Sequence, residues 1–124
     1  MLFRSVAHNN LGYALAAQGR YEEAISHYRE AIRLDDNFVL AHNNLGVALA
    51  AQGKFEEAIS HYREAVRLDD RNSKGHTNLG VALVQAGRFE EAVPQLRRAL
   101  ELDPHNASVE RNLTLALQKS GRPD

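Results

Sequence analysis

The sequence lacks cysteine, long apolar runs and a strong net charge. The absence of cysteine excludes disulfide bonds, thiolate zinc sites and a cysteine nucleophile. No apolar run approaches the roughly 20 residues of a membrane-spanning helix, so we expect no association with membranes. The net charge of -1 gives no indication of a general affinity for nucleic acid.

The rest of the composition is ordinary for a water-soluble protein, with 44% apolar and 25% charged residues. A chain of 124 residues is long enough for one modest domain with a buried core, and we expect residues 1–124 to form a single domain. The N-terminal sequence MLFR is too short to serve as a secretory signal peptide. Together these features favour a cytoplasmic location.

The sequence repeats itself with a period of 34 residues. Residues 7–36 read AHNNLGYALAAQGRYEEAISHYREAIRLDD, and residues 41–70 differ from them at four of thirty positions. A third copy occupies residues 75–104, and a partial fourth copy begins at residue 109. A fixed period of roughly 20 to 50 residues is typical of a solenoid, in which each unit buries its apolar face against its neighbours.

Each full copy contains two segments in which apolar residues recur at helical spacing. In the first copy we expect helices at about residues 6–18 and about residues 21–34. A glycine follows the first segment of every copy, as is common where a helix ends in a left-handed residue: Gly19, Gly53, Gly87 and Gly121. Units at about residues 5–38, 39–72 and 73–106, with a last helix at about residues 107–120, give seven helices.

The first helix of each full copy also contains an internal glycine, although glycine in a helix costs about 1 kcal/mol. These glycines are Gly12, Gly46 and Gly80. An alanine recurs on the second helix of each copy, at Ala24, Ala58 and Ala92. Because neither residue has bulk, we expect the two helices of a unit to pack closely.

The recurring pattern is Leu-Gly, then an aromatic residue or Leu, then Gly-(Arg/Lys)-(Tyr/Phe)-Glu-Glu-Ala, then Tyr, Ala and finally Asp-Pro. It resembles the tetratricopeptide repeat family across residues 5–122. The resemblance implies an all-α fold, namely a right-handed α-solenoid of three helix-turn-helix units and a C-terminal capping helix. One departure is that histidine stands where the family often has tryptophan, at His8, His42 and His76.

The resemblance also implies a concave groove lined by the first helix of each unit. One asparagine per copy is expected on this face: Asn10, Asn44, Asn78 and Asn112. An amide carries both a donor and an acceptor, so it can pair with both groups of a peptide bond, and family members use asparagines here in that way. We expect this row to hold a peptide backbone. The alternative is structural, because asparagine is common here in members with no known ligand.

An apolar stripe is expected on the same face, at Tyr13, Val47, Val81 and Leu115, flanked by Val6, Leu40 and Val84. Contiguous exposed apolar surface usually marks an interaction site. The alternatives are that neighbouring side chains cover the stripe or that a second chain fills it.

Two further expectations concern ligand specificity. The slot beside the asparagine row holds Asn9 and Asn43 but becomes Thr77 and Arg111 in later copies, so we expect it to select the ligand. Lys74 and Arg111 make one end of the groove mildly basic, which favours a ligand with an acidic residue or a free C-terminus.

Chaperone-binding members of the family grip a C-terminal carboxylate with five conserved polar residues. At the matching places this chain has Asn9, Tyr13, Asn44, Lys74 and Asn78. Only Asn44 and Lys74 agree, so we do not expect a carboxylate clamp of that kind.

Catalysis and metal binding are not indicated. Equivalent histidines lie one repeat apart, roughly 10 Å or more, whereas zinc requires its ligands at about 2.0 to 2.1 Å from one ion. There is no glycine-rich phosphate loop and no set of nucleophile and base. We therefore expect no enzymatic activity, no cofactor and no metal.

The leading functional hypothesis is a non-catalytic module that binds an extended or partly helical segment of a protein or peptide in the groove. The alternative is a structural or self-associating segment of a longer scaffold, which would form homo-oligomers through the groove or through the chain ends.

Overall fold

The computed structural model describes residues 2–121. This part of the chain forms seven helices and no strand: α1 (Leu2–Ala17), α2 (Tyr21–Leu34), α3 (Val39–Ala51), α4 (Phe55–Leu68), α5 (Ser73–Gln85), α6 (Phe89–Leu102) and α7 (Ala107–Ser120). The expectation of an all-α fold with seven helices is therefore confirmed. The bounds of the repeat units stay a prediction.

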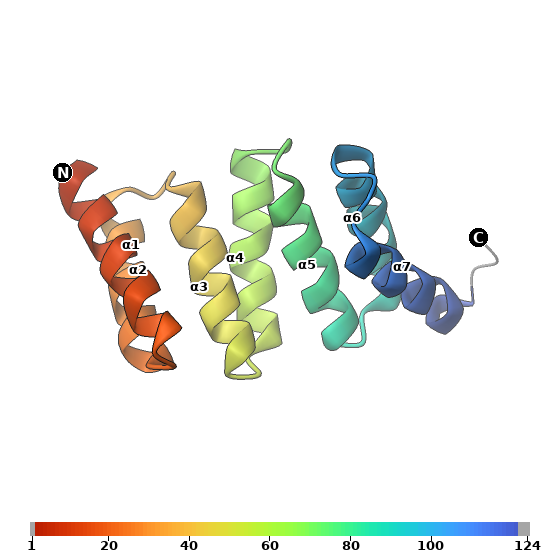
Figure 1. Ribbon diagram of the computed structural model, residues 1–124, viewed down its shortest axis with the longest axis horizontal. Helices are drawn as coiled ribbons and strands as arrows, with labels where there is room; N and C mark the ends of the chain where they lie inside the picture. Colours follow the sequence, from red (N-terminus) through yellow and green to blue (C-terminus); the bar gives the residue numbers. More distant parts are fainter. Residues whose placement is uncertain (1, 122–124) are drawn as a thin grey trace.

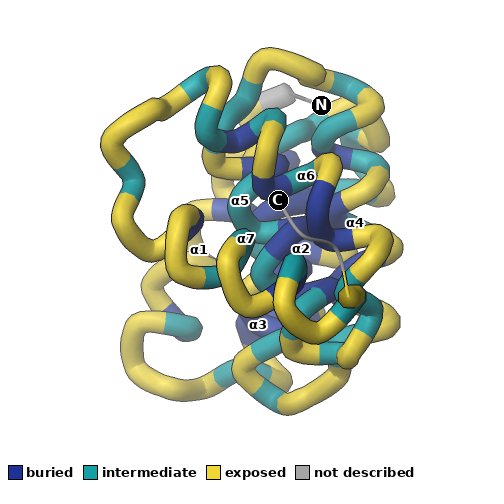
Figure 2. The backbone as a smooth tube through the Cα atoms, turned by 90° about the vertical axis from the view of Figure 1, so that its right-hand side faces the viewer, coloured by how far each residue is buried: buried dark blue, intermediate teal, exposed yellow. Residues whose placement is uncertain are grey.

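The helices are arranged in two layers. They follow one another in chain order along the long axis of the molecule (Figure 1). In the view from the C-terminal end, α1, α3, α5 and α7 lie on one side and α2, α4 and α6 on the other (Figure 2). Each first helix packs against the second helix of its own unit, and each second helix also contacts the next first helix. This alternation makes one continuous core.

The helix ends follow the local sequence signals, with one correction. The second helix of unit one has the expected bounds, but α1 begins at Leu2 and ends at Ala17 rather than spanning residues 6–18. The glycine after each first helix has a positive φ of 75° to 78°, a conformation that glycine adopts without steric cost. Asn72 caps α5 by accepting a hydrogen bond from the backbone N–H of Gly75 at 3.1 Å.

The core is made by the second helices and by the leucines of the first helices. In α2 the buried face consists of Ala24, Ile25, Tyr28 and Ala31. The internal glycines let this face approach, as expected. A Cβ atom at Gly12 would lie 2.7 Å from the ring of Tyr28 and 3.1 Å from the carbonyl oxygen of Ala24. The glycine therefore makes room for a large side chain as well as for the neighbouring backbone.

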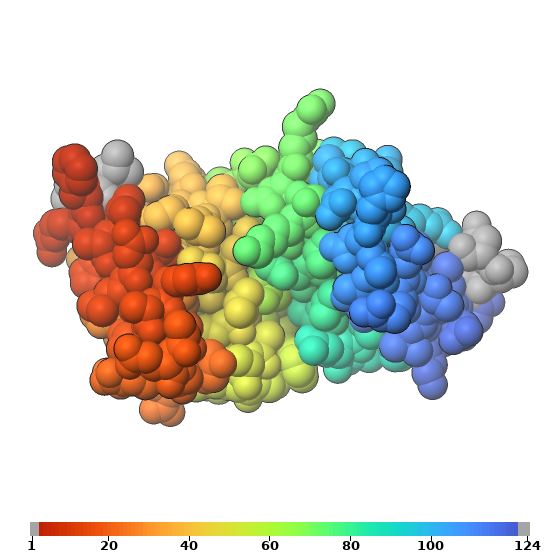
Figure 3. Space-filling view, in the orientation of Figure 1, coloured from red at the N-terminus to blue at the C-terminus, as the bar shows by residue number. Residues whose placement is uncertain are grey.

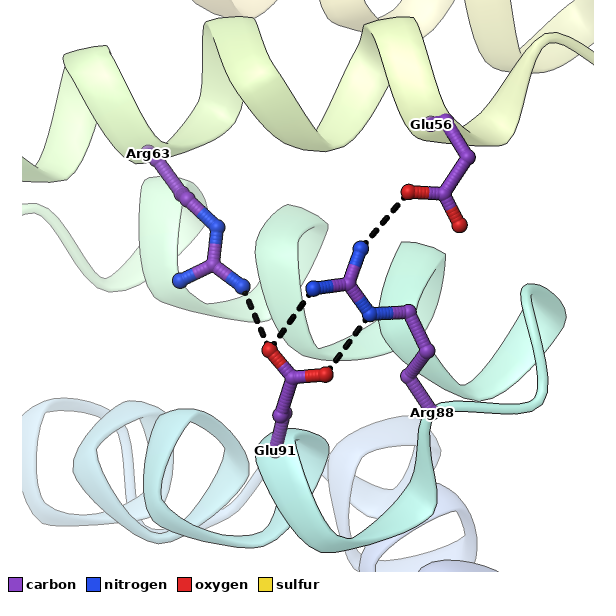
Figure 4. A network of polar contacts seen from close by, with 4 residues as sticks. All are labelled: Glu56, Arg63, Arg88 and Glu91. Carbon is purple, nitrogen blue, oxygen red and sulfur yellow. Dashed lines mark hydrogen bonds and ion pairs between the residues drawn. The ribbon is translucent and has the colours of Figure 1, made fainter.

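Charged side chains link successive second helices in the layer formed by α2, α4 and α6. Arg88 binds Glu91 of its own unit through Nε at 2.7 Å and reaches back to Glu56 through Nη1 at 2.6 Å (Figure 4). Arg63 of α4 binds the same Glu91 at 2.9 Å. The hydrogen bond from Arg88 is the main reason that the pKa of Glu91 is lowered. Because these groups are largely exposed, each pair contributes little to stability.

Candidate functional site

Two adjoining hollows lie between the first helices at the N-terminal half of the solenoid. The first, which we call the apolar hollow, has a volume of about 210 Å³. It is lined by Tyr13, Ala16, Ala17, Tyr21, Tyr28, Asn44, Val47 and Ala48. The second, the polar hollow, has a volume of about 300 Å³ and is lined by Asn9, Asn10, Tyr13, Leu40, Asn44 and Lys74. Both share Tyr13 and Asn44, so together they form one groove, and Figure 3 shows the face made by the first helices.

Tyr13 stands between the two hollows. Its side chain is 66% exposed, although an aromatic ring of this size would bury a large apolar area in contact with a ligand. Tyr28 lies beneath it, and burial together with the neighbouring Tyr13 raises the pKa of Tyr28 to about 12. The phenol of Tyr28 therefore stays neutral near pH 7. Tyr13 offers a flat apolar face and a hydroxyl to a ligand.

The doubled asparagines interlock neighbouring units. Nδ2 of Asn44 donates a hydrogen bond to Oδ1 of Asn9 at 3.0 Å, which connects α3 to α1. Asn9 is only 2% exposed and lies at the floor of the polar hollow. The first asparagine of one unit thus accepts from the second asparagine of the next unit.

The expected exposure of Asn9 and Asn43 on the groove face is wrong, because both side chains are buried. Helical spacing alone placed them beside the asparagine row, but the side chain of Asn9 faces α3 and accepts a hydrogen bond from Asn44. Asn9 therefore contributes to the candidate site by holding Asn44 in place.

The equivalent pair one unit later is left open. Oδ1 of Asn43 and Nδ2 of Asn78 are both buried and without a hydrogen-bond partner. The equivalent atoms one unit earlier, Oδ1 of Asn9 and Nδ2 of Asn44, are hydrogen-bonded to each other. The sequence therefore supplies the residues for a second bridge of the same kind, but these two atoms are not hydrogen-bonded in this structure.

The remaining two asparagines of the row differ again. Asn10 is exposed, since no unit precedes it in the structure. Nδ2 of Asn112 donates to the backbone carbonyl of Ser108 within α7 at 2.9 Å. The four amides consequently do not form a uniform row of free groups, and only Asn10 and Asn44 line the groove.

The apolar stripe is exposed in part. Its exposed members and their flanks are Val6, Tyr13, Leu40, Val47 and Leu115. Val81 is half-buried, and Val84 packs against the core. The expectation that these two valines face solvent is therefore corrected.

The basic residues separate into two places. Lys74, at the start of α5, lines the polar hollow beside Asn44 of α3. Arg111 is exposed on α7. Like Leu115 and Asn112 of the same helix, it lines neither hollow. Of the predicted residues, the structure thus gathers Asn9, Asn10, Tyr13, Asn44, Val47 and Lys74. It does not bring Asn43, Asn78, Val81 or the residues of α7 to the same two hollows.

Tyr21 was not predicted as a site residue, yet it lines the apolar hollow from the start of α2. The later copies have phenylalanine at the same place, at Phe55 and Phe89. That difference was a signal in the sequence, since only the first copy adds a hydroxyl group at this position.

A third hollow of about 360 Å³ lies at the turn between α1 and α2, lined by Gly19, Arg20, Tyr21, Glu22, Glu23 and Gln52. Of its charged groups, Arg20 binds Glu23 at 2.7 Å. None of the predicted site residues lines this hollow.

Sequence reasoning also missed that histidines pair within a unit. Nδ1 of His8 lies 3.0 Å from Nδ1 of His27, and Nδ1 of His42 lies 3.4 Å from Nδ1 of His61. In unit three, Nδ1 of His76 lies 2.9 Å from Oε1 of Gln95 instead. The spacing of 19 residues was visible in the sequence, but only the packing of the two helices brings the rings together.

The proton positions of the second pair follow from its partners. Nε2 of His42 lies 3.0 Å from the carbonyl oxygen of Asp36, which can only accept. Nε2 of neutral His42 therefore carries the hydrogen, its Nδ1 accepts, and Nδ1 of His61 donates.

We expect stability to fall when the pH is lowered below about 6.5, the ordinary pKa of histidine. The pKa of His61 is lowered first by burial, then by the facing His42 and by Arg29, against the opposing charges of Glu57 and Glu64. Since the unfolded chain then binds more protons than the folded one, stability is complete above pH 6.5 and declines toward the lower folded pKa.

The variant His61→Gln imitates the non-titrating Gln95 of unit three. At pH 7.5 its melting temperature should lie close to that of the wild type, within about 0.5 kcal/mol of stability. Between pH 7.5 and pH 5.5 it should lose less stability than the wild type. An identical decline for both proteins would show that this pair does not contribute.

Two negative findings hold for residues 2–121. No cluster of three or more histidine, cysteine or acidic side chains is placed to hold a metal ion there. None of the helices in that range is both long and apolar enough to cross a membrane.

Comparison with solved structures finds TPR domains of the same fold. The first TPR domain of Spaghetti (RPAP3), bound to the HSP90 peptide SRMEEVD, is similar with a TM-score of 0.90 and 27% identity, covering 97% of this chain and 98% of that one. The second TPR domain of human RPAP3, in complex with the HSP70 peptide SGPTIEEVD, has a TM-score of 0.87 and 27% identity, covering 92% and 95%. The TPR domain of Arabidopsis OM64 shares the fold, with a TM-score of 0.89 at 24% identity over 94% and 97%.

Comparison of sequences gives the family. No curated protein sequence matches the chain. The TPR repeat pattern matches residues 12–53, and the tetratricopeptide repeat pattern matches residues 37–105, which is more than half of the 124 residues. The chain therefore belongs to the tetratricopeptide repeat family.

Proposed function

We propose that the protein is a non-catalytic interaction module that binds an extended or partly helical peptide segment in the groove. The observation that carries this proposal is the junction of the two hollows at Tyr13 and Asn44. An exposed aromatic ring there adjoins amides and one ammonium group. Binding sites combine apolar area with a few polar groups in this way, since the area gives affinity and the polar groups fix the orientation.

The ligand in this proposal carries an acidic residue next to an apolar one. Lys74 is the charged residue in the lining of the polar hollow, so it favours a carboxylate at that point. Two similar domains were solved with peptides that end in Glu-Glu-Val-Asp, which are acidic as well. An apolar ligand side chain would enter the apolar hollow beside Val47.

We further propose that the segment is internal rather than a free C-terminus. Asn44 and Lys74 agree with the carboxylate-gripping members of the family, but Asn9, Tyr13 and Asn78 are neutral at the other three places. Asn9 is also buried and bonded to Asn44. A single cation at the rim supplies little energy for a terminal carboxylate, whereas Tyr13 supplies apolar contact to any side chain.

The finer expectations belong to the same proposal. The net charge of -1 supports a protein or peptide partner over nucleic acid. The absence of cysteine is compatible with a cytoplasmic location. The proposal of a non-catalytic module is supported by the histidines and charged residues that pair with one another within the structure.

Peptides selected from a random display library on the immobilised protein test this proposal. We expect the selected sequences to combine an acidic and an apolar residue. Tyr13→Ala should lower the affinity for a synthetic peptide of a selected sequence about tenfold, which corresponds to about 1.4 kcal/mol. Lys74→Gln should lower the affinity for the same peptide about threefold. Amidation of the peptide's C-terminus should change little.

The matched control is Ser60→Ala on the exposed side of α4, which should bind like the wild type. Titration by calorimetry or fluorescence anisotropy checks these expectations. If Tyr13→Ala binds the selected peptides undiminished, the groove is not the binding site.

A further inference from the structure

The phenol of Tyr28 is a buried polar group that the chain itself leaves unpaired. Tyr28 is only 1% exposed, and it lines the apolar hollow between α1 and α3. Its ring packs against Gly12, where a Cβ atom would lie 2.7 Å from Cε1. Its hydroxyl makes no hydrogen bond to any of residues 2–121. Since most buried polar side-chain atoms have a partner, this hydroxyl is available to a group that enters the hollow.

Asn44 brings a second polar group to the same hollow. It lines the hollow from α3, and its Nδ2 is engaged in the hydrogen bond to Asn9. Its Oδ1 has no partner among the described residues and can accept a hydrogen bond. The phenol of Tyr28 keeps its proton near pH 7, so it can donate as well as accept. The hollow therefore offers two hydrogen-bonding groups within a lining of alanine, valine and tyrosine side chains.

The sequence concentrates phenols at this hollow. Three repeat positions that line it are all tyrosine in unit one, whereas unit two has one tyrosine there and unit three has none. The residues are Tyr13, Tyr21 and Tyr28, then Val47, Phe55 and Tyr62, and finally Val81, Phe89 and Leu96. At the third of these positions a leucine fills the space beside the internal glycine of unit three. Packing of the core therefore does not require the hydroxyl of Tyr28.

The size and the lining of the hollow limit what can occupy it. Its volume of about 210 Å³ lies below the roughly 300 to 1,000 Å³ of small-molecule sites, so it suits a single side chain. An aliphatic side chain would cover the Tyr28 hydroxyl without offering it a partner, which opposes binding. An aromatic ring with a polar edge supplies both apolar contact and a hydrogen-bonding group.

We propose that the apolar hollow selects an aromatic side chain with a hydrogen-bonding edge, namely the phenol of tyrosine or the indole of tryptophan, and that Tyr28 determines this selection. The inference rests on the proposed function of the groove and narrows the apolar residue of the peptide to one chemical class. The ring of the ligand lies against Tyr13, and its O–H or N–H donates to Oη of Tyr28 or Oδ1 of Asn44. The valine of the peptides SRMEEVD and SGPTIEEVD lacks such an edge.

Four acetylated and amidated peptides are the probes, with the sequence Gly-Ser-Glu-X-Glu-Ser-Gly and X as tyrosine, tryptophan, phenylalanine or valine. The two glutamates let Lys74 meet a carboxylate on either side of X. Titration into the isotope-labelled protein should shift the amide resonances around Tyr13, Asn44 and Val47, and it gives each dissociation constant. We expect the tyrosine and tryptophan peptides to bind about fivefold more tightly than the phenylalanine peptide, because each gains a hydrogen bond. The tighter of the two shows whether a phenol or an indole is preferred.

The variant Tyr28→Phe removes only the hydroxyl and keeps the ring that packs against Gly12. It should therefore fold like the wild type, as circular dichroism checks, and it should prefer the tyrosine peptide over the phenylalanine peptide by less than about twofold. Tyr62→Phe is the matched control, since Tyr62 is equally buried one unit later and lines neither hollow. This control should keep the full preference of the wild type.

Two results would overturn the inference while leaving the proposed function intact. In the first, Tyr13→Ala weakens all four peptides, but the wild type binds the phenylalanine or valine peptide as tightly as the other two. In the second, Tyr28→Phe retains the wild-type preference, so that Tyr28 does not make the selection. If none of the peptides shifts a resonance of the groove at millimolar concentration, both the inference and the proposed function are wrong.

Discussion

Replacing Leu45 by alanine is expected to lower the free energy of unfolding by about 3 kcal/mol, whereas the same change at Leu11 should lower it by less than about 1 kcal/mol. The two leucines occupy the same repeat position within the same hexapeptide, AHNNLG. Leu45 is completely buried and Leu11 is 47% exposed. A buried leucine loses its transfer free energy and leaves a cavity, while a half-exposed leucine loses little of either.

Urea denaturation followed by circular dichroism checks this expectation at a low protein concentration. Leu79→Ala is a second buried variant, since Leu79 is the counterpart in unit three and is also buried. It should resemble Leu45→Ala. Equal losses for Leu11→Ala and Leu45→Ala would mean that Leu11 is covered in solution.

Removing the amide of Asn44 is expected to lower the free energy of unfolding by about 1 to 3 kcal/mol. Asn44→Ala deletes the donor to Asn9 and leaves the buried Oδ1 of Asn9 without a partner. Because a buried unpaired acceptor is more costly than the loss of an average hydrogen bond, the double variant Asn9→Ala/Asn44→Ala should lose less than the sum of the single losses.

Two matched controls accompany this prediction. Asn10→Ala should change stability by less than about 0.5 kcal/mol, since Asn10 is exposed. Asn78→Ala should have a smaller effect than Asn44→Ala, because its Nδ2 has no partner to lose. Chemical denaturation of the five proteins provides the measurement, and strict additivity of the Asn9 and Asn44 losses would contradict the proposed bridge.

This bridge also affects how ligand binding can be tested. A loss of peptide affinity in Asn44→Ala could arise from displacement of α3 relative to α1 as well as from the lost contact. Tyr13→Ala avoids this difficulty, because the ring of Tyr13 is mostly exposed and shares no hydrogen bond with the core. The exposed aromatic residue is therefore the better test of the groove.

Much of the fold could be predicted because it depends on local pattern and on repetition. The period of 34 residues, the helical spacing of apolar residues and the glycine after each first helix together give seven helices in the right order. The internal glycines also indicate close packing. They could not show that the ring of Tyr28, Tyr62 or the side chain of Leu96 fills the space, because that depends on the side-chain rotamers of the partner helix.

The candidate site was less predictable, since adjacent residues on one helix face different neighbours. Asn9 and Asn10 are consecutive, yet one is buried beneath α3 and the other is exposed. A rotation of about 100° per residue separates them, so their environments depend on where the next unit lies. Val81 is half-buried while Val47, its counterpart one unit earlier, is exposed, so the repeat position does not by itself determine exposure.

The sequence by itself determined the repeat, the two helices of each unit and the family pattern, because these follow from the periodic spacing of apolar residues, glycines and capping residues along one chain. Only the tertiary structure decided which copies of identical residues are buried, paired or free. Leu11 and Leu45, or Asn10 and Asn44, have the same neighbours in sequence. They differ because burial and hydrogen bonding are set by the preceding unit, which α3 has and α1 lacks within the described residues 2–121.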